Sequence, residues 1–330
     1  MASEGIIDLN NDEIQKLLTL ASKITANPCL ETDLFCFQAK EHSRNIPERL
    51  KDLLVQFSKK GSKTGFLLIR TIPFDNNSIP PTPNLVDPIN KIGENTILAR
   101  IQSLFISFIA NLISYEAESN GRLFQDIFPV KGMEKQQTSV GSSTELEIHT
   151  EQAFSKLKPD ILCLACIRSN PEAKTHILPV SSIIQNMDSH EQQLLRLPLW
   201  KTGVDLSFKL NNIEFIHGDI RGPMPILSGQ LDDPILTFDQ DLMFGIKNEF
   251  NTFIDKIVDI YYQKRISHVL LPGEIVLIDN LRTVHGRSPF TTKYDGNDRF
   301  IIRCFGIYNF ESTRMARLNN NNRMISAIFS

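Results

Sequence analysis

The sequence has few cysteines, a small net charge and no apolar stretch long enough to cross a bilayer. Five cysteines among 330 residues are too few and too irregularly spaced for a disulfide framework, and an odd number fits a reducing compartment. The net charge is −3, and the Lys and Arg residues are scattered, which argues against a nucleic-acid-binding protein. The most apolar window, residues 97–113, contains Arg100 and is too short for a membrane span.

The chain also lacks the start of a secreted protein, because no basic segment followed by an apolar core stands at its beginning. We therefore expect an intracellular protein that binds no membrane. Hydrophobic residues make up 41% and charged residues 22%, which is ordinary for a compact chain with a packed core. A small molecule is the favoured partner, and the sequence leaves a homo-oligomer open.

Local patterns divide the chain into a mainly helical part, about 1–120, and a strand-rich part, about 121–312. Apolar residues at helical spacing predict helices at 12–24 and 46–60, and the run at 95–116 predicts the longest helix. The predicted strands are 65–72, 123–130, 144–150, 160–169, 176–184, 205–210, 213–218, 268–280 and 299–310, and the helices between them are 181–197 and 240–264. This order predicts a single α+β catalytic domain, 1–330, whose core is a β-sandwich or jelly roll with flanking helices.

Cys163 and Cys166 form a C-x-x-C pair that resembles a zinc or redox motif. They lie within a predicted strand, where residues three apart point to opposite faces. They cannot chelate one ion together, so we expect two buried packing cysteines.

Two histidines are each followed two residues later by an acid, in His149-Thr150-Glu151 and His217-Gly218-Asp219. Two residues at this spacing share a face of a strand and can supply two ligands of a non-haem iron site. Such a pair is expected about once by chance with seven histidines and 38 acids, and either pair can simply be hydrogen-bonded at the surface.

The surrounding residues favour the first pair as a metal site. His217 precedes glycines and a proline that indicate a turn, whereas His149 ends an alternating run. His285 follows a buried strand and a polar bend, and it stands next to Gly286 and Arg287. A histidine at the end of a strand has less reason to be packing material, so His285 is the favoured third ligand.

Arg299 and Arg303 are expected on one face of the strand predicted at 299–310. Two guanidinium groups on an apolar strand are costly unless they meet anions, and Arg binds carboxylates with two parallel hydrogen bonds. One could hold a cosubstrate carboxylate and the other a second small acid. For Arg299 the alternative is an exposed strand end paired with Asp295 or Asp298.

Several linked segments resemble one family of enzymes. "SVGSSTELEIHTEQAF", "KPDILCLACIRSNPEAKT", "LPGEIVLIDNLRTVHGRSPF" and "DRFIIR", in this order, look like the clavaminate synthase-like Fe(II)/2-oxoglutarate oxygenases. Among these the chain is most similar to the hydroxylases of free amino acids. The similarity covers about residues 115–310 and implies a double-stranded β-helix (jelly-roll) core, with Fe(II), 2-oxoglutarate and O2 as the cofactor and cosubstrates.

Carried over by position, the resemblance implies a role for each of nine residues. His149, Glu151 and His285 would bind iron, and Arg299 with Thr175 would bind the 2-oxoglutarate side carboxylate. The residues expected to bind the substrate are Arg303 and Ser139 at its α-carboxylate and Asp239 and Asp241 at a cationic end.

The acids near this pocket, together with a general resemblance to bacterial lysine hydroxylases, favour L-lysine as the substrate, with arginine second and asparagine third. Glu116 and Glu118 are also within reach, although surface positions are the favoured interpretation of both. The expected reaction is 3- or 4-hydroxylation of lysine. A jelly-roll module that binds a small acid without catalysis is the alternative from another class, and a zinc hydrolase is a weaker third. Residues 218–234, rich in Gly and Pro, are the candidate for a lid over the substrate.

Overall fold

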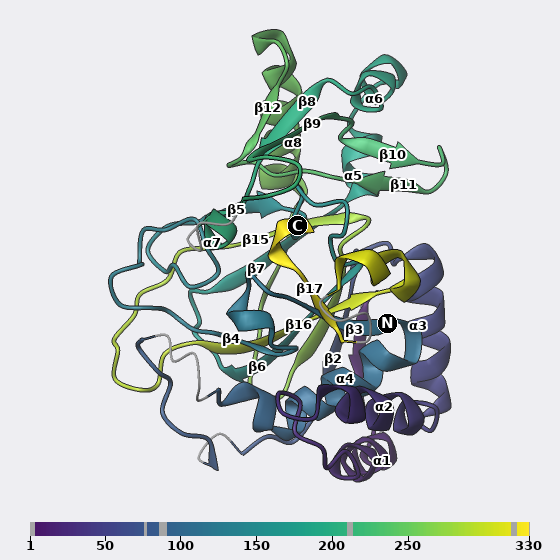
Figure 1. Ribbon diagram of the computed structural model, residues 1–330, viewed down its shortest axis with the longest axis vertical. Coiled ribbons are helices and arrows are strands. Elements are labelled where there is room, and N and C mark those ends of the chain that lie inside the picture. Colours follow the sequence, from purple (N-terminus) through teal and green to yellow (C-terminus); the bar gives the residue numbers. More distant parts are fainter. Residues whose placement is uncertain (1–3, 76–77, 86–90, 210–213, 318–321, 330) are drawn as a thin grey trace.

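Four N-terminal helices lie against a large β-sheet in the computed structural model, which describes residues 4–75, 78–85, 91–209, 214–317 and 322–329 (Figure 1). Within these ranges, no helix combines the length and the apolar character that crossing a bilayer requires. The α-helices are α1 (Asn11–Ser22), α2 (Thr32–Ser43), α3 (Glu48–Lys60), α4 (Ile97–Ile109), α5 (Val180–Gln185), α6 (Ser189–Leu195), α7 (Leu206–Lys209) and α8 (Asn251–Lys264).

The strands of the described residues form two main sheets and two small ones. The larger sheet has the order β1 (Ile6–Asp8), β2 (Phe66–Arg70), β14 (Ile275–Asp279), β6 (Ile161–Arg168), β16 (Phe300–Ile307), β3 (Asn111–Tyr115) and β17 (Met324–Ile325), with β4 (Gln125–Ile127) also paired to β16. The second sheet has the order β13 (Ile266–Val269), β7 (Lys174–Pro179), β15 (Thr283–Arg287) and β5 (Leu146–His149). The small sheets are β12 (Met243–Gly245), β8 (Trp200–Gly203) and β9 (Ile220–Met224), and β10 (Leu227–Gly229) with β11 (Pro234–Leu236).

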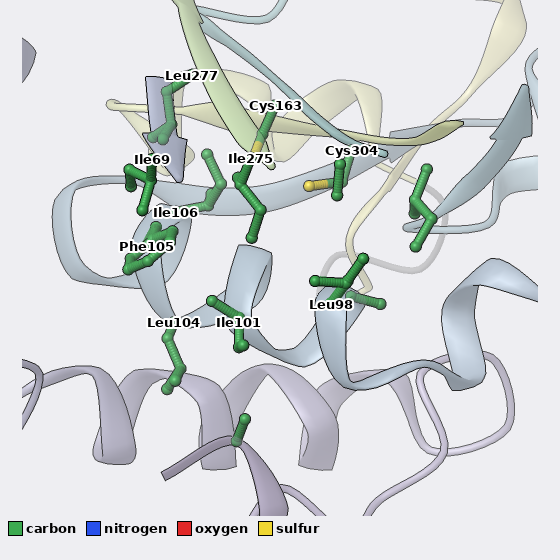
Figure 2. Close-up of a cluster of buried hydrophobic side chains, with 14 of the residues drawn as sticks. Ile69, Leu98, Ile101, Leu104, Phe105, Ile106, Cys163, Ile275, Leu277 and Cys304 are labelled. Carbon is green, nitrogen blue, oxygen red and sulfur yellow. The ribbon is translucent and has the colours of Figure 1, made fainter. Parts of the chain in front are cut away.

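The helices cover one face of the larger sheet. Strand residues alternate in direction, so Cys163 of β6, Ile275 of β14 and Cys304 of β16 all point toward α4, where they meet Leu98 and Ile101 (Figure 2). Apolar side chains of α1, α2 and α3 complete this core. Burial of these apolar side chains stabilises the helical part of the chain.

The opposite face of the larger sheet packs on the second sheet. Leu164 and Ile301 of the larger sheet belong to the same buried cluster as Ile177 of β7. The two sheets therefore lie face to face, and the polar residues that interrupt this cluster are collected between them.

Several predicted elements are confirmed and others are wrong. The predictions at 12–24 and 46–60 correspond to α1 and α3, but α2 was not predicted. The helix expected at 95–116 ends at Ile109, because the following apolar run pairs with β16 as strand β3. The expectation that this helix is the longest is also wrong, because α4 is shorter than α8.

Two predicted strands are absent from the described residues. Residues 206–209 form helix α7, which buries Phe208 in the core between the sheets, although the alternation of residues suggested a strand. Residues 214–218 contain a turn and no strand, and residues 210–213 lie outside the described residues. Phe208 and Phe215 are nevertheless both buried in the core between the sheets, so neither segment needs a strand to bury its aromatic residue.

Candidate metal centre and substrate pocket

Two strands of the second sheet bring two of the predicted metal ligands together. His149 ends β5 and lies directly opposite His285 of β15, with the two imidazole centroids 4.6 Å apart. Glu151 follows in the turn after β5, and its Oε1 lies 3.4 Å from Nε2 of His285. One ligand atom from each residue can be chosen so that all three lie within 4.8 Å of one another.

The spacing from His149 had suggested that Glu151 lies on the same strand, but Glu151 lies in a turn beyond the end of β5. Its backbone is fixed instead by the side chain of Asn280. The Glu151 N–H donates to Asn280 Oδ1 at 2.7 Å, and Asn280 Nδ2 donates to the Glu151 carbonyl at 3.2 Å. Asn280 is buried at the end of β14, so the larger sheet orients one member of the triad. No local sequence signal distinguished this residue.

The protonation states of the triad suit a divalent cation. Nδ1 of His149 lies 2.8 Å from the Glu147 carbonyl, which can only accept a hydrogen bond, and this contact leaves Nε2 as the ring atom available to a metal. Burial and the nearby His149 lower the pKa of His285, which favours its neutral, ligating form. Nδ1 of His285 is buried, and no residue that the structure describes forms a hydrogen bond with it. Two histidines and one carboxylate with room beside them form the donor set of non-haem Fe(II) oxygenases.

Arg303 connects the triad to a second buried carboxylate. Its Nη1 lies 3.1 Å from Glu151 Oε1, its Nη2 lies 2.7 Å from Glu118 Oε2, and its Nε donates to Gln125 Oε1 at 2.8 Å. Burial would raise the pKa of Glu151, but the charge of Arg303 and the hydrogen bond from His285 outweigh it and leave the pKa below its usual range. Glu151 therefore stays ionised.

Glu118 was expected at the surface, and this expectation is wrong. Only 6% of the residue is exposed, and Gln125 and Gln152 donate to its carboxylate in addition to Arg303. Burial raises its pKa, while Arg303 opposes this rise. Glu116 is at the surface as expected, where its carboxylate accepts hydrogen bonds from Ser326 and Ala327.

A cavity of about 400 Å³ between the two sheets is lined by every residue that the sequence assigned to the site. The predicted residues that line it are His149, Glu151, His285, Arg299, Thr175, Arg303, Ser139, Asp239 and Asp241. None of residues 218–234, the expected lid, lines the cavity, and Asp205, Leu206 and Ser207 lie there instead.

One end of the cavity is cationic. Arg299 is 6% exposed, and burial lowers its pKa to about 10. The alternative of an exposed strand end is therefore wrong, and Asp298 uses its carboxylate to accept from the backbone of Lys293 and Tyr294. Thr175 of β7 is buried beside this end, and its Oγ1 has no hydrogen-bond partner among the described residues.

Another part of the cavity is acidic. Asp239 is bridged to His149 by backbone pairing and is 6% exposed, and its Oδ1 accepts from the Leu242 N–H at 2.8 Å. Asp241 is exposed at the rim. Asp205, which the sequence did not indicate, also faces the cavity. Burial and the neighbouring Asp239 raise the pKa of Asp205 to about 8, and burial raises that of Asp239 to about 7.

The other candidate motifs do not join this site. Cys163 and Cys166 are free and buried, and they belong to the cores on opposite faces of the larger sheet, as the strand pattern predicted. His217 and Asp219 are exposed next to a turn.

The fold and the donor set together define a non-haem iron oxygenase, and comparisons with known proteins agree. The model of the family "Taurine catabolism dioxygenase TauD, TfdA family" matches residues 226–305. An L-lysine 3-hydroxylase of Catenulispora acidiphila is 40% identical over 326 residues, which cover 99% of this chain and 90% of that protein. An L-asparagine oxygenase of Streptomyces coelicolor is 29% identical and covers 82% of this chain and 79% of that protein.

A solved structure of an asparagine oxygenase with Fe(II), 2S,3S-3-hydroxyasparagine and succinate superimposes with a TM-score of 0.89. It is 26% identical and covers 98% of this chain and 99% of that chain. The chain therefore belongs to the clavaminate synthase-like amino-acid hydroxylases of the TauD/TfdA family. It is an Fe(II)/2-oxoglutarate-dependent dioxygenase that uses O2.

Proposed function

We propose that this dioxygenase hydroxylates free L-lysine, at carbon 3. The observation that carries the proposal is a cavity lined by the His149, Glu151 and His285 triad together with the buried Arg299, which suits an organic acid, and with Asp239 and Asp205, which suit an ammonium group. The relative with 40% identity is named an L-lysine 3-hydroxylase, whereas three relatives named L-lysine 4-hydroxylase are 22 to 24% identical.

The positions of these residues in the cavity support the roles that we propose for them. His149, Glu151 and His285 hold Fe(II), which together with 2-oxoglutarate and O2 supplies the oxidant that replaces C–H by C–OH. We assign Arg299 and Thr175 to the distal carboxylate of 2-oxoglutarate. Arg299 is a buried cation, and Oγ1 of Thr175 is buried without a hydrogen-bond partner among the described residues. The protein contributes orientation and the exclusion of water.

Two charged ends of the substrate match two groups of residues. The buried Arg303 and Glu118 offer opposite charges 2.7 Å apart, which suits the α-carboxylate and the α-ammonium group of an amino acid. Ser139 also lines the cavity. Asp239 and Asp205 suit the ε-ammonium group of lysine, with Asp241 at the rim. Holding both ends places one methylene group at the metal, so position rather than intrinsic reactivity selects the carbon.

Arginine has the same charge as lysine and is the second candidate, whereas the neutral asparagine would leave buried carboxylates without a cation. We also interpret the two stacked sheets as a double-stranded β-helix. The N-terminal helices pack on it within one catalytic domain spanning 1–330.

A panel of the twenty amino acids tests the proposal. Succinate formation is measured with Fe(II), 2-oxoglutarate and each amino acid, and the product is analysed by mass spectrometry and NMR. Lysine should give the fastest succinate formation, with one added oxygen at carbon 3. Faster coupled turnover with arginine or asparagine would contradict the substrate, and hydroxylation at carbon 4 would contradict the position.

A further inference from the structure

Arg287 stands beside the residues assigned to the 2-oxo acid, although nothing in the sequence suggested a role for it. It lies two residues after His285 on β15, so both side chains point to the same face of the sheet. In the ladder between β15 and β7, Arg287 is directly opposite Thr175. Directly opposite residues have Cβ atoms about 5 Å apart, which places the two side chains together in the cavity wall.

The hydrogen bonds of the Arg287 guanidinium use two of its three nitrogen atoms. Nε donates to the Ser288 carbonyl at 3.3 Å, and Nη1 donates to the Ser139 carbonyl at 3.1 Å. Nη2 is buried and has no hydrogen-bond partner in the part of the chain that the structure describes, and the same holds for Oγ1 of Thr175. Buried donors are rarely left unsatisfied, and two such groups on neighbouring strands indicate an acceptor that arrives with a ligand.

The charges lead to the same conclusion. The guanidinium carbons of Arg287 and Arg299 lie 4.9 and 6.0 Å from the centroid of one ring, that of Phe290. Only 4% of Arg287 and 6% of Arg299 are exposed, and neither forms an ion pair with any residue that the structure describes. Two buried cations near one another are unfavourable unless an anion lies close to both.

We propose that Arg287 is a second cationic contact, beside Arg299, for the distal carboxylate of the 2-oxo dicarboxylic acid. This inference rests on the proposed function, because that function brings the anion to this end of the cavity. It adds a residue whose guanidinium binds the cosubstrate directly, on the same strand face as the metal ligand His285. The site then discriminates strongly between 2-oxo acids with and without a distal carboxylate.

A structural role must be separated from this one, because Arg287 also holds the Ser139 carbonyl. The two roles are separated by a double-mutant cycle, in which the distal carboxylate of the acid and the Arg287 side chain are removed singly and together. Binding of 2-oxoglutarate and of 2-oxopentanoate, which lacks the distal carboxylate, is measured by calorimetry without turnover, using protein loaded with Mn(II). The proteins are the wild type, Arg287→Met, Arg287→Lys and Arg299→Met.

Arg287→Met should weaken 2-oxoglutarate binding by about 10- to 100-fold, the usual range for a charge-assisted hydrogen bond, and 2-oxopentanoate binding by less than about threefold. The affinity of Arg287→Lys for 2-oxoglutarate should lie between those of Arg287→Met and the wild type, because lysine keeps the positive charge. Arg299→Met should show the same discrimination. Arg100→Met is the matched control, since Arg100 is also partly buried and donates to the carbonyls of Ile24 and Asn95 away from the cavity.

Two results would overturn the inference, and they differ in what they say about the proposed function. If Arg287→Met weakens both acids equally, or neither, while Arg299→Met discriminates between them, Arg287 is a structural residue and the proposed function stands. If the wild-type protein binds 2-oxoglutarate no better than 2-oxopentanoate, the assignment of this end of the cavity is wrong and both proposals fail.

Discussion

Arg303 and Glu151 form a buried ion pair across the two sheets, with Nη1 3.1 Å from Oε1. One metal ligand is therefore balanced by a cation before any metal is bound. The arginine comes from β16 of the larger sheet, whereas the histidines come from the second sheet. The charge of the site thus depends on how the two sheets pack.

Arg303→Met should destabilise the fold. The substitution leaves Glu118 and Glu151 buried without their shared cation, and breaking a buried pair in this way costs about 3–5 kcal/mol. Denaturant unfolding of the metal-free protein measures the loss. Arg44→Met is the control, because its pair with Glu41 is exposed and should contribute less than about 1 kcal/mol. Equal losses in the two variants would show that the buried network is not stabilising.

Glu151→Ala should lose metal and turnover together, since the remaining two histidines provide an incomplete donor set. Metal content after dialysis and succinate formation are the measurements. Asp219→Ala is the matched control, because Asp219 belongs to the exposed His-x-acid pair outside the cavity. Unchanged metal content in Glu151→Ala would remove this residue from the metal site.

Asp239 and Asp241 should differ in their importance for lysine. Asp239→Asn keeps the oxygen that accepts from the Leu242 N–H but removes the buried charge, so KM for lysine should rise by about 10- to 100-fold. Asp241 is exposed, and Asp241→Asn should change KM by less than about threefold because solvent screens its charge. Steady-state kinetics with lysine varied decides the matter, and the reverse order would place the cation at the rim.

Lysine binding should strengthen as the pH rises toward 8. Burial and the neighbouring Asp239 raise the pKa of Asp205 to about 8, so below this pH its carboxyl is largely protonated in the absence of substrate. The ε-ammonium group stays charged over this range and binds the ionised carboxylate, so binding releases a proton. Calorimetry from pH 6 to 8.5 in buffers of different ionisation enthalpy measures both effects. In Asp205→Asn the pH dependence and the proton release should shrink, and their persistence would exclude this residue as their source.

The cysteines should be inert in the folded protein. Cys29 is partly exposed, and the other four described cysteines are buried. Burial raises the pKa of the Cys166 thiol to about 12, so little thiolate is available to react. A thiol reagent should label Cys29 first and the rest only after unfolding, as read by mass spectrometry of the labelled peptides. Rapid joint labelling of Cys163 and Cys166 would restore the redox interpretation.

Regular periodicity explains which elements could be predicted. Long, nearly continuous apolar runs identified the strands that became β6, β14 and β16, because each of these strands is buried on both faces of the larger sheet. The shorter run at 111–115 could continue a helix or form a strand, and only pairing with β16 decided between them. The prediction of a strand at 205–210 was wrong for a similar reason, since Phe208 can be buried from a helix as well as from a strand.

The sequence by itself determined the chemical types in the site, through the His-x-Glu pair, the distal histidine and the arginines spaced along one strand. Tertiary structure alone decided which isolated polar residues join them: Asn280 behind Glu151, Glu118 beside Arg303, and Asp205 and Arg287 in the cavity wall. The physical reason is that local spacing fixes only the direction of neighbouring side chains. Whether a lone polar residue meets solvent, a protein partner or a ligand depends on segments far away in the chain that pack against it.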